Sequence, residues 1–140
     1  MPLALPQATD KYDRGDQDKL RSAVALAVDD VAQLAPFVRG QITMPFTATP
    51  DLDASRASVF VMTLTANVTS STLSKATDGQ PIRVILKQDG TGGQTFAWPT
   101  NMKGTMVISA GINTVSAQEF VYEKASGNAY ATSPGVVGMI

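Results

Sequence analysis

The sequence predicts a mainly β protein: a jelly-roll-like antiparallel β-sandwich of about seven or eight strands, preceded by one N-terminal α-helix. Two observations lead to this fold class. The composition changes near residue 40: the last hundred residues hold 14 Thr and 9 Ser, with most of the Gly, Pro and aromatic residues. Beyond that point, β-branched segments alternate with turn signals roughly every ten residues. We therefore expect an N-terminal arm and helix over residues 1–40 and a sandwich over residues 41–140.

The helix is predicted from about Asp13 or Asp16 to Ala35. Aspartates crowd its start, Ala, Leu and Gln fill its body, and Pro36 blocks its continuation. Apolar residues recur in it with a seven-residue period. So short a stripe is stable only when packed, on its own β domain, on copies of itself or in a groove of another protein. The stripe consists of Leu20, Val24, Ala27, Val31 and Leu34.

The strands follow Arg39-Gly40 in regular order. Pro45 places the first of them at a sheet edge or a bulge. Asp89-Gly90-Thr91-Gly92-Gly93 reads as a hairpin turn, which makes the segment after it the hairpin partner of the segment before it. No internal repeat of the length typical of a solenoid or propeller is visible. The predicted strands are 41–48, 59–68, 82–87, 95–98, 106–108, 114–124 and 129–132.

Charge and composition exclude several function classes. Eleven basic and twelve acidic residues give a net charge of -1, so no basic surplus exists to neutralise a nucleic-acid backbone. The chain contains neither Cys nor His, which removes disulfides, thiolate and Ser-His nucleophiles, and nearly every structural zinc site. No window is apolar over the roughly 20 residues that a membrane span needs, and no signal peptide is recognisable. We expect no nucleic-acid or membrane partner and no cofactor.

The remaining titratable groups do not form a recognisable catalytic or metal site. Asp51-Leu52-Asp53 offers two oxygen ligands for calcium but lacks the rest of a ligand loop. Glu119 and Glu123 are four residues apart in the last long strand and so share one face, and a solvent-exposed strand face explains this spacing. The other carboxylates lie in turns, where Asp makes local hydrogen bonds. We therefore expect no catalytic and no metal-ligating residue, and no enzymatic activity; the carboxylates weighed are Asp51, Asp53, Asp78, Asp89, Glu119 and Glu123.

One long segment resembles a module of tailed-bacteriophage appendage proteins, found in tail fibres, head fibres and capsid decoration proteins. Residues 76–99, ATDGQPIRVILKQDGTGGQTFAWP, carry the order DGQ, hydrophobic strand, Gln-Asp, Thr-Gly-Gly, strand, Trp-Pro. Leu64-Thr-Ala-Asn-Val-Thr before it and Gly111-Ile-Asn-Thr-Val-Ser after it also fit. Residues 8–24 are similar to the segment that docks many phage fibres onto the virion. The resemblance implies a β-sandwich, commonly trimeric, that is structural or adhesive and has no catalytic residues.

Two functions are compatible with this resemblance. The first is a trimeric capsid decoration or cement protein that clamps capsid subunits, because a short chain with one small β domain departs from the long tail-fibre pattern. Residues 1–40 would bind the major capsid protein or another virion protein. The alternative is a head- or tail-fibre module that binds a host receptor or glycan. Its candidate surface or intersubunit aromatics are Trp98, Tyr122 and Tyr130. Under both, the protein is made in the host cytoplasm and resides in the virion.

Overall fold

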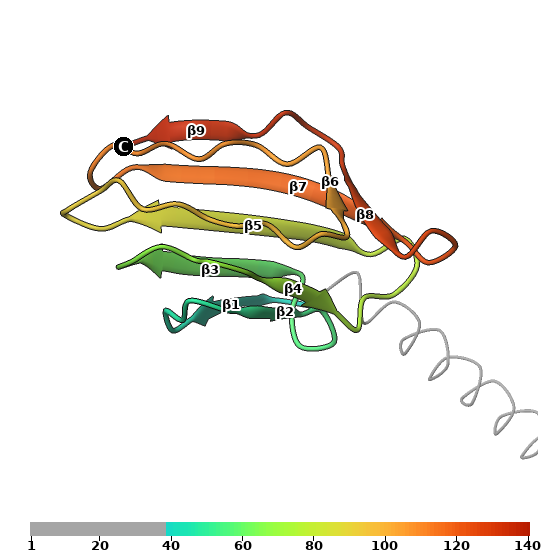
Figure 1. The fold of residues 1–140 in the computed structure, drawn as a ribbon. Coiled ribbons are helices and arrows are strands. Elements are labelled where there is room, and N and C mark those ends of the chain that lie inside the picture. Colours follow the sequence, from blue (N-terminus) through green and yellow to red (C-terminus); the bar gives the residue numbers. More distant parts are fainter. Residues whose placement is uncertain (1–38) are drawn as a thin grey trace, which may run out of the picture. The chain divides into compact units, whose positions relative to one another are not determined.

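The computed structural model describes residues 39–140, and this part of the chain is built from nine β-strands (Figure 1). The predicted N-terminal helix and its apolar stripe lie outside the described residues. The strands are β1 (Gln41–Met44), β2 (Asp51–Asp53), β3 (Val59–Leu64), β4 (Thr72–Ser74), β5 (Pro81–Gln88), β6 (Met102–Lys103), β7 (Val115–Glu123), β8 (Asn128–Ala131) and β9 (Val136–Met139).

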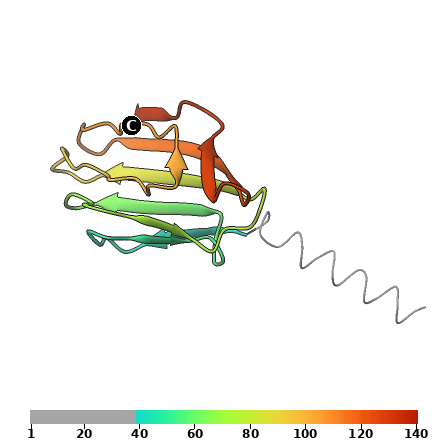
Figure 2. The ribbon, with the colours of Figure 1, turned by 45° about the vertical axis from the view of Figure 1, so that its right-hand side comes forward.

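The first part of this unit is a β-solenoid of about three turns. The strands β1, β3 and β5 stack side by side in one sheet and run in the same direction. The chain returns between them along a second, smaller sheet formed by β2 and β4. A parallel bridge between Val68 and Phe96 extends this return layer to the third turn. Figure 1, and Figure 2 after a turn of 45°, show β1, β3 and β5 stacked in this order.

This winding contradicts the predicted antiparallel jelly-roll sandwich. Short strands at regular spacing are expected from a meander, but they arise equally when successive strands alternate between two sheets of one coil. In a meander β1 would pair with the next strand along the chain, whereas here β1 pairs with β3 and β2 pairs with β4. The predicted hairpin partner at 95–98 is also wrong: its Phe96 bridges Val68, and β5 pairs with β3 and β7.

The turns of the solenoid differ in length, which explains why no repeat is visible in the sequence. Gln41 is paired with Val59, and Val59 with Arg83, so successive turns are offset by 18 and then 24 residues. A repeat detected by self-similarity needs a constant period. In this solenoid the turns differ in length, but the strands of successive turns still pair residue by residue.

The last part of the chain closes the sheet with antiparallel strands. The long strand β7 pairs with β5 from Val115 to Val121, and then with β8 at one end and β9 at the other. The short strand β6 pairs with β8 in parallel. The large sheet therefore has β1 as its edge on one side, while β9 and the β8–β6 pair lie beyond β7 on the other.

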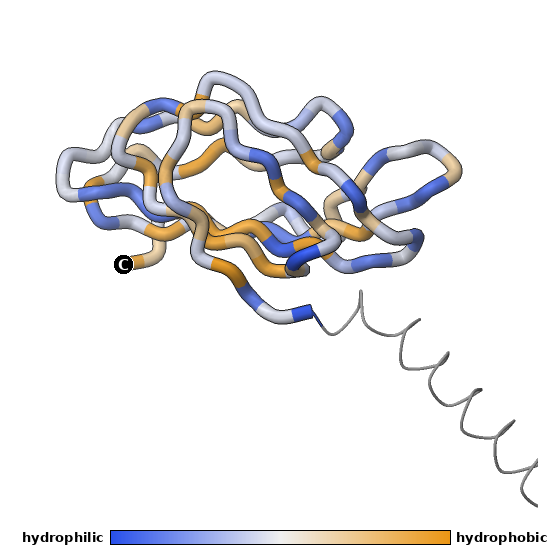
Figure 3. Tube along the Cα trace, turned by 90° about the horizontal axis from the view of Figure 1, so that it is seen from below, coloured by the Kyte–Doolittle hydropathy of each residue, from blue (hydrophilic) through white to orange (hydrophobic). Residues whose placement is uncertain are grey.

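The core lies between the two layers and follows the alternation of the strands. In β5 the inward residues Ile82, Val84 and Leu86 are almost completely buried, and Phe60 and Phe120 face them from the neighbouring strands. Hydrophobic residues gather along the strands, while the connecting loops are mostly hydrophilic (Figure 3). Each fully buried side chain of this size stabilises the fold by about 1.5–3 kcal/mol.

Three buried glutamines join the irregular segments to the sheet. The amide of Gln80 binds Thr77 N, Ala54 O and Ser58 Oγ, each at 3.0 Å. The amide of Gln88 donates to the carbonyls of Gln94 and Ser109 at 2.7 and 2.8 Å and accepts from Gln94 N at 3.1 Å. These side chains satisfy backbone groups that no strand partner reaches.

Gln118 is the third of these residues and holds the last segment in place. Its side-chain oxygen accepts from Met106 N at 2.8 Å. Its nitrogen donates to the carbonyls of Gly104 and Ser133, both also at 2.8 Å. The hydrogen bond to Met106 N is buried, so this N–H has little access to water as a substitute, whereas the carbonyls of Gly104 and Ser133 are partly exposed.

We expect Gln118→Leu to lower the free energy of unfolding by about 2 kcal/mol, because it leaves the buried Met106 N without a partner and removes two partly exposed hydrogen bonds. The matched control is Gln41→Leu on the exposed face of β1, where we expect a change within about 0.5 kcal/mol. Urea unfolding of the two variants measures the difference. Equal midpoints would show that Gln118 does not hold the segment.

Candidate functional site

The glycine-rich turn after β5 is a tightly built structural element. The Asp89 carboxylate accepts hydrogen bonds from the backbone N–H groups of Thr91 and Gly92, both at 2.9 Å. Gly92 has φ +70°, and a Cβ added to it would lie 2.7 Å from the carbonyl oxygen of Ala110. The Asp-Gly-Thr-Gly-Gly segment therefore fixes a backbone contact between the turn and residue 110.

Trp98 is an anchor of the core. Its ring packs edge-on against Phe96, with centroids 4.9 Å apart, and tilted against Phe120 at 5.6 Å. Its indole N–H donates to the carbonyl of Met106 at 3.0 Å, and Pro99 behind it is fully buried. The Trp-Pro end of the phage-like segment thus ties the return layer to residue 106.

The other two candidate aromatics have different environments. Tyr122 is partly buried and packs against the core. Tyr130 is 43% exposed, and its hydroxyl lies 3.4 Å from Asn128 Nδ2. Hydrogen bonds from Ser126 and then Asn128 lower the pKa of Tyr130. Of the three predicted aromatics, Tyr130 is the most accessible to a partner.

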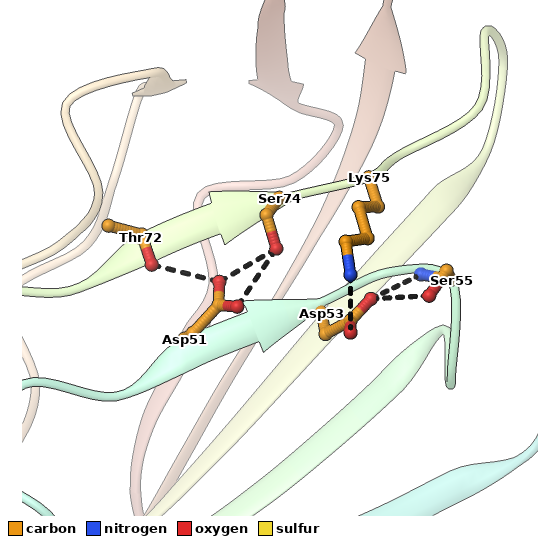
Figure 4. A network of polar contacts seen from close by, with 6 residues as sticks. All are labelled: Asp51, Asp53, Ser55, Thr72, Ser74 and Lys75. Atoms are coloured by element: carbon orange, nitrogen blue, oxygen red, sulfur yellow. Dashed lines mark hydrogen bonds and ion pairs between the residues drawn. The ribbon is translucent and has the colours of Figure 1, made fainter.

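Asp51 and Asp53 belong to a side-chain ladder between β2 and β4 (Figure 4). Asp51 accepts from the hydroxyls of Thr72 and Ser74, each at 2.8 Å. Asp53 accepts from the hydroxyl of Ser55 at 2.6 Å and lies 3.6 Å from Lys75 Nζ. The Ser55 hydroxyl is the main cause of a lowered Asp53 pKa. Both carboxylates are thus engaged in joining two turns of the solenoid.

The remaining carboxylates do not converge. Asp78 accepts from Lys124 N at 2.9 Å, at the end of β7. Glu119 forms an ion pair with the Nε of Arg83, its partner in the register of β5 and β7. Glu123 is exposed at the end of β7. Within residues 39–140, no group of three or more acidic residues is placed to hold a metal ion.

The outward face of the large sheet carries a feature with the chemistry of a binding site. A hollow there, which we call the arginine hollow, lies over the start of β3 and β5. Along one register row, Val59 of β3, Arg83 of β5 and Glu119 of β7 are direct neighbours. The lining residues are Arg39, Ser58, Val59, Pro81, Arg83 and Glu119.

Arg39 reaches this hollow from the segment that precedes β1. The carbonyl of the following residue, Gly40, accepts a hydrogen bond from Ser58 N at 3.2 Å, which holds this segment beside β3. The Nε atom of Arg39 is buried and has no hydrogen-bond partner in the described part of the chain. A buried guanidinium N–H without an acceptor is unfavourable; because this Nε is buried, only the rest of the guanidinium is available to the hollow that Arg39 lines.

Two further hollows lie nearby. One adjoins the arginine hollow on the same face, since both share Arg83 and Glu119, and is lined further by Ile85, Ala117 and Ser133. The other lies beside β1 and β2 at the first turn, where Arg56 accompanies Asp51 and Asp53. The carboxylates of this last hollow are already engaged in the side-chain ladder.

Sequence reasoning named Glu119 but neither arginine. Arg83 alternates with buried residues along its strand, which indicates an outward side chain and nothing more. Arg39 reaches the same hollow only because β1, β3 and β5 are parallel neighbours, and the sequence indicated an antiparallel sandwich. Knowledge of the parallel pairing would have been needed to place Arg39 beside Arg83.

A family model described as "Putative phage tail fibre C-terminal domain" matches residues 48–124. This match covers more than half of the chain. The chain belongs to this family of tail fibre domains. The matched segment extends from before β2 to the end of β7, and so contains the three glutamines and the glycine-rich turn. No curated protein matches the sequence.

Membership of the tail fibre family makes the protein a structural, virion-associated phage protein. It confirms the predicted class of phage appendage proteins. Within the part of the chain that the structure describes, there is no helix with the length and apolarity to cross a bilayer.

We expect Gly92→Ala to destabilise this tail fibre domain by more than Gly93→Ala, although both glycines have positive φ. Gly93 has no atom within 4 Å of an added Cβ, so its substitution costs only the left-handed strain of about 1–2 kcal/mol. Gly92→Ala adds the clash with Ala110 O. Thermal unfolding of the two variants compares them, and equal melting temperatures would contradict the contact.

Proposed function

We propose that this protein is a non-enzymatic tail fibre component whose β-solenoid binds a receptor or glycan on the surface of the host bacterium. The family match over residues 48–124 carries this proposal. It supports the fibre alternative better than a clamp on capsid subunits. Residues 1–40, with the stripe from Leu20 to Leu34, are proposed to bind another virion protein.

We further propose that copies of the chain associate, as a homotrimer. Apart from Tyr130, the exposed large apolar residues of the described part lie on β9, at residue 140 and in the segment 107–112 before β7; we call this set the C-terminal patch. It is formed by β9 and by the segment before β7, which run close together, since a Cβ on Gly138 would lie 3.6 Å from Ser109 Oγ. Apolar patches of this kind are typical of interfaces. The patch consists of Val107, Ile112, Val136, Val137, Met139 and Ile140.

Light scattering of the full chain tests the association. We expect a mass of three times 14.7 kDa, and a shift towards the monomer for Val137→Glu, because a carboxylate would be buried without a partner. Thr63→Glu, at an exposed position of β3, is the matched control and should leave the mass unchanged. If wild type and Val137→Glu have the same mass, the patch is not the interface.

Binding of the full chain to cells tests the host contact. We expect the labelled protein to bind a susceptible strain and to compete with phage adsorption, and to bind a mutant strain without surface polysaccharide at least tenfold less. Capsids stripped of accessory proteins are the comparison. Binding to those capsids with none to cells would favour the cement function and contradict the fibre function.

A further inference from the structure

We propose that the arginine hollow binds the carboxylate of an acidic sugar on the host surface. That the ligand is a sugar rests on the proposed function. That the recognised group is a carboxylate rests on the geometry and charge of the hollow. It assigns the contact to Arg39 and Arg83, with Val59 and Pro81 between them.

The parallel register brings the two arginines to the same hollow. Gln41 of β1 pairs with Val59 of β3, which pairs with Arg83 of β5, so Arg39, two residues before Gln41, lies near the end of the sheet where Arg83 stands. Arginine side chains are long enough to approach a common ligand from these positions. Val59 lies on the strand between them and Pro81 begins the next, which gives the hollow an apolar floor.

Both arginines retain hydrogen-bond donors. The Nε of Arg39 is buried, so the contact with a ligand falls to its terminal nitrogens. Arg83 uses its Nε on Glu119, and its side chain is 63% exposed, which leaves it accessible to a ligand. A guanidinium has five N–H donors in a planar fork, which matches the two oxygens of a carboxylate.

The charge of the hollow favours a singly charged anion. Arg39 and Arg83 contribute two positive charges and Glu119 one negative charge, so one carboxylate neutralises the site. A phosphate monoester carries up to two negative charges and would face repulsion from Glu119. The apolar floor of Val59 and Pro81 suits the C–H face of a sugar ring.

The test is a titration of the full chain with glucuronic acid, followed through the Arg Nε–Hε signals in NMR spectra. We expect glucuronic acid to shift the Arg39 and Arg83 signals and to bind at least tenfold more tightly than glucose or glucose 6-phosphate. Tighter binding of the phosphate would overturn the carboxylate assignment. Equal binding of glucose would overturn the role of the charge.

Variants separate the arginines from general effects. We expect Arg39→Gln to weaken glucuronic acid binding at least tenfold, and Arg39→Lys to weaken it as well, because the lysine lacks the planar fork. Arg56→Gln, at an exposed position of the first turn, is the matched control and should bind like wild type. Glu119→Gln should strengthen binding, since it removes the competing carboxylate. Unchanged binding in Arg39→Gln, with an unchanged fold in NMR spectra, would overturn the proposal.

Two outcomes distinguish this inference from the proposed function. If the wild-type chain binds cells but Arg39→Gln binds them equally, the host contact stands and the arginine hollow is not its site. If Arg39→Gln instead lowers the mass in solution, an acidic group of a second copy occupies the hollow, and the sugar assignment is wrong.

Discussion

The fold depends on three buried glutamine side chains. A β-solenoid with turns of unequal length has backbone groups at its corners that no neighbouring strand reaches, and an unpaired buried group costs about 1–3 kcal/mol. Gln80, Gln88 and Gln118 each make three hydrogen bonds, and eight of these nine bonds go to backbone groups, the ninth to the Ser58 hydroxyl. An apolar side chain would pack at these positions but would leave the corners unsatisfied. The glutamines therefore allow an irregular coil to have a closed interior.

These contacts show what the residues of the phage-like segment 76–99 do in the fold. Its two glutamines hold corners, its aspartate and glycines build a close turn, and its Trp-Pro end ties the return layer to residue 106. None of these groups is left over for a ligand. The glutamines, the turn and the Trp-Pro end therefore serve the fold, whereas Pro81 and Arg83 of the same segment line the arginine hollow on the outward face.

Much of the strand content could be predicted from the sequence, but its arrangement could not. The predicted segments 82–87 and 114–124 coincide with β5 and β7, and 59–68 contains β3 but extends four residues beyond its end at Leu64. These strands are recognisable because their side chains alternate between buried and exposed positions. Pairing depends on which strands meet, and a return strand as short as β2 has three residues and little pattern. The same limit applies to the site. The outward direction of Glu119 could be predicted from the alternation along its strand. That Arg39 and Arg83 line one hollow could not be predicted, because it follows from the parallel pairing of β1, β3 and β5.

Parallel stacking also separates stability from recognition in this domain. Inward positions of β3 and β5 are filled by Phe60, Ile82 and Val84, which are almost completely buried. The outward positions of the same strands form rows across the sheet, in which each turn contributes one side chain at a fixed spacing of about 5 Å. A change in such a row alters the chemistry of the face without disturbing the core. The arginine hollow lies on these rows, so its charge is set by residues that the fold itself does not require.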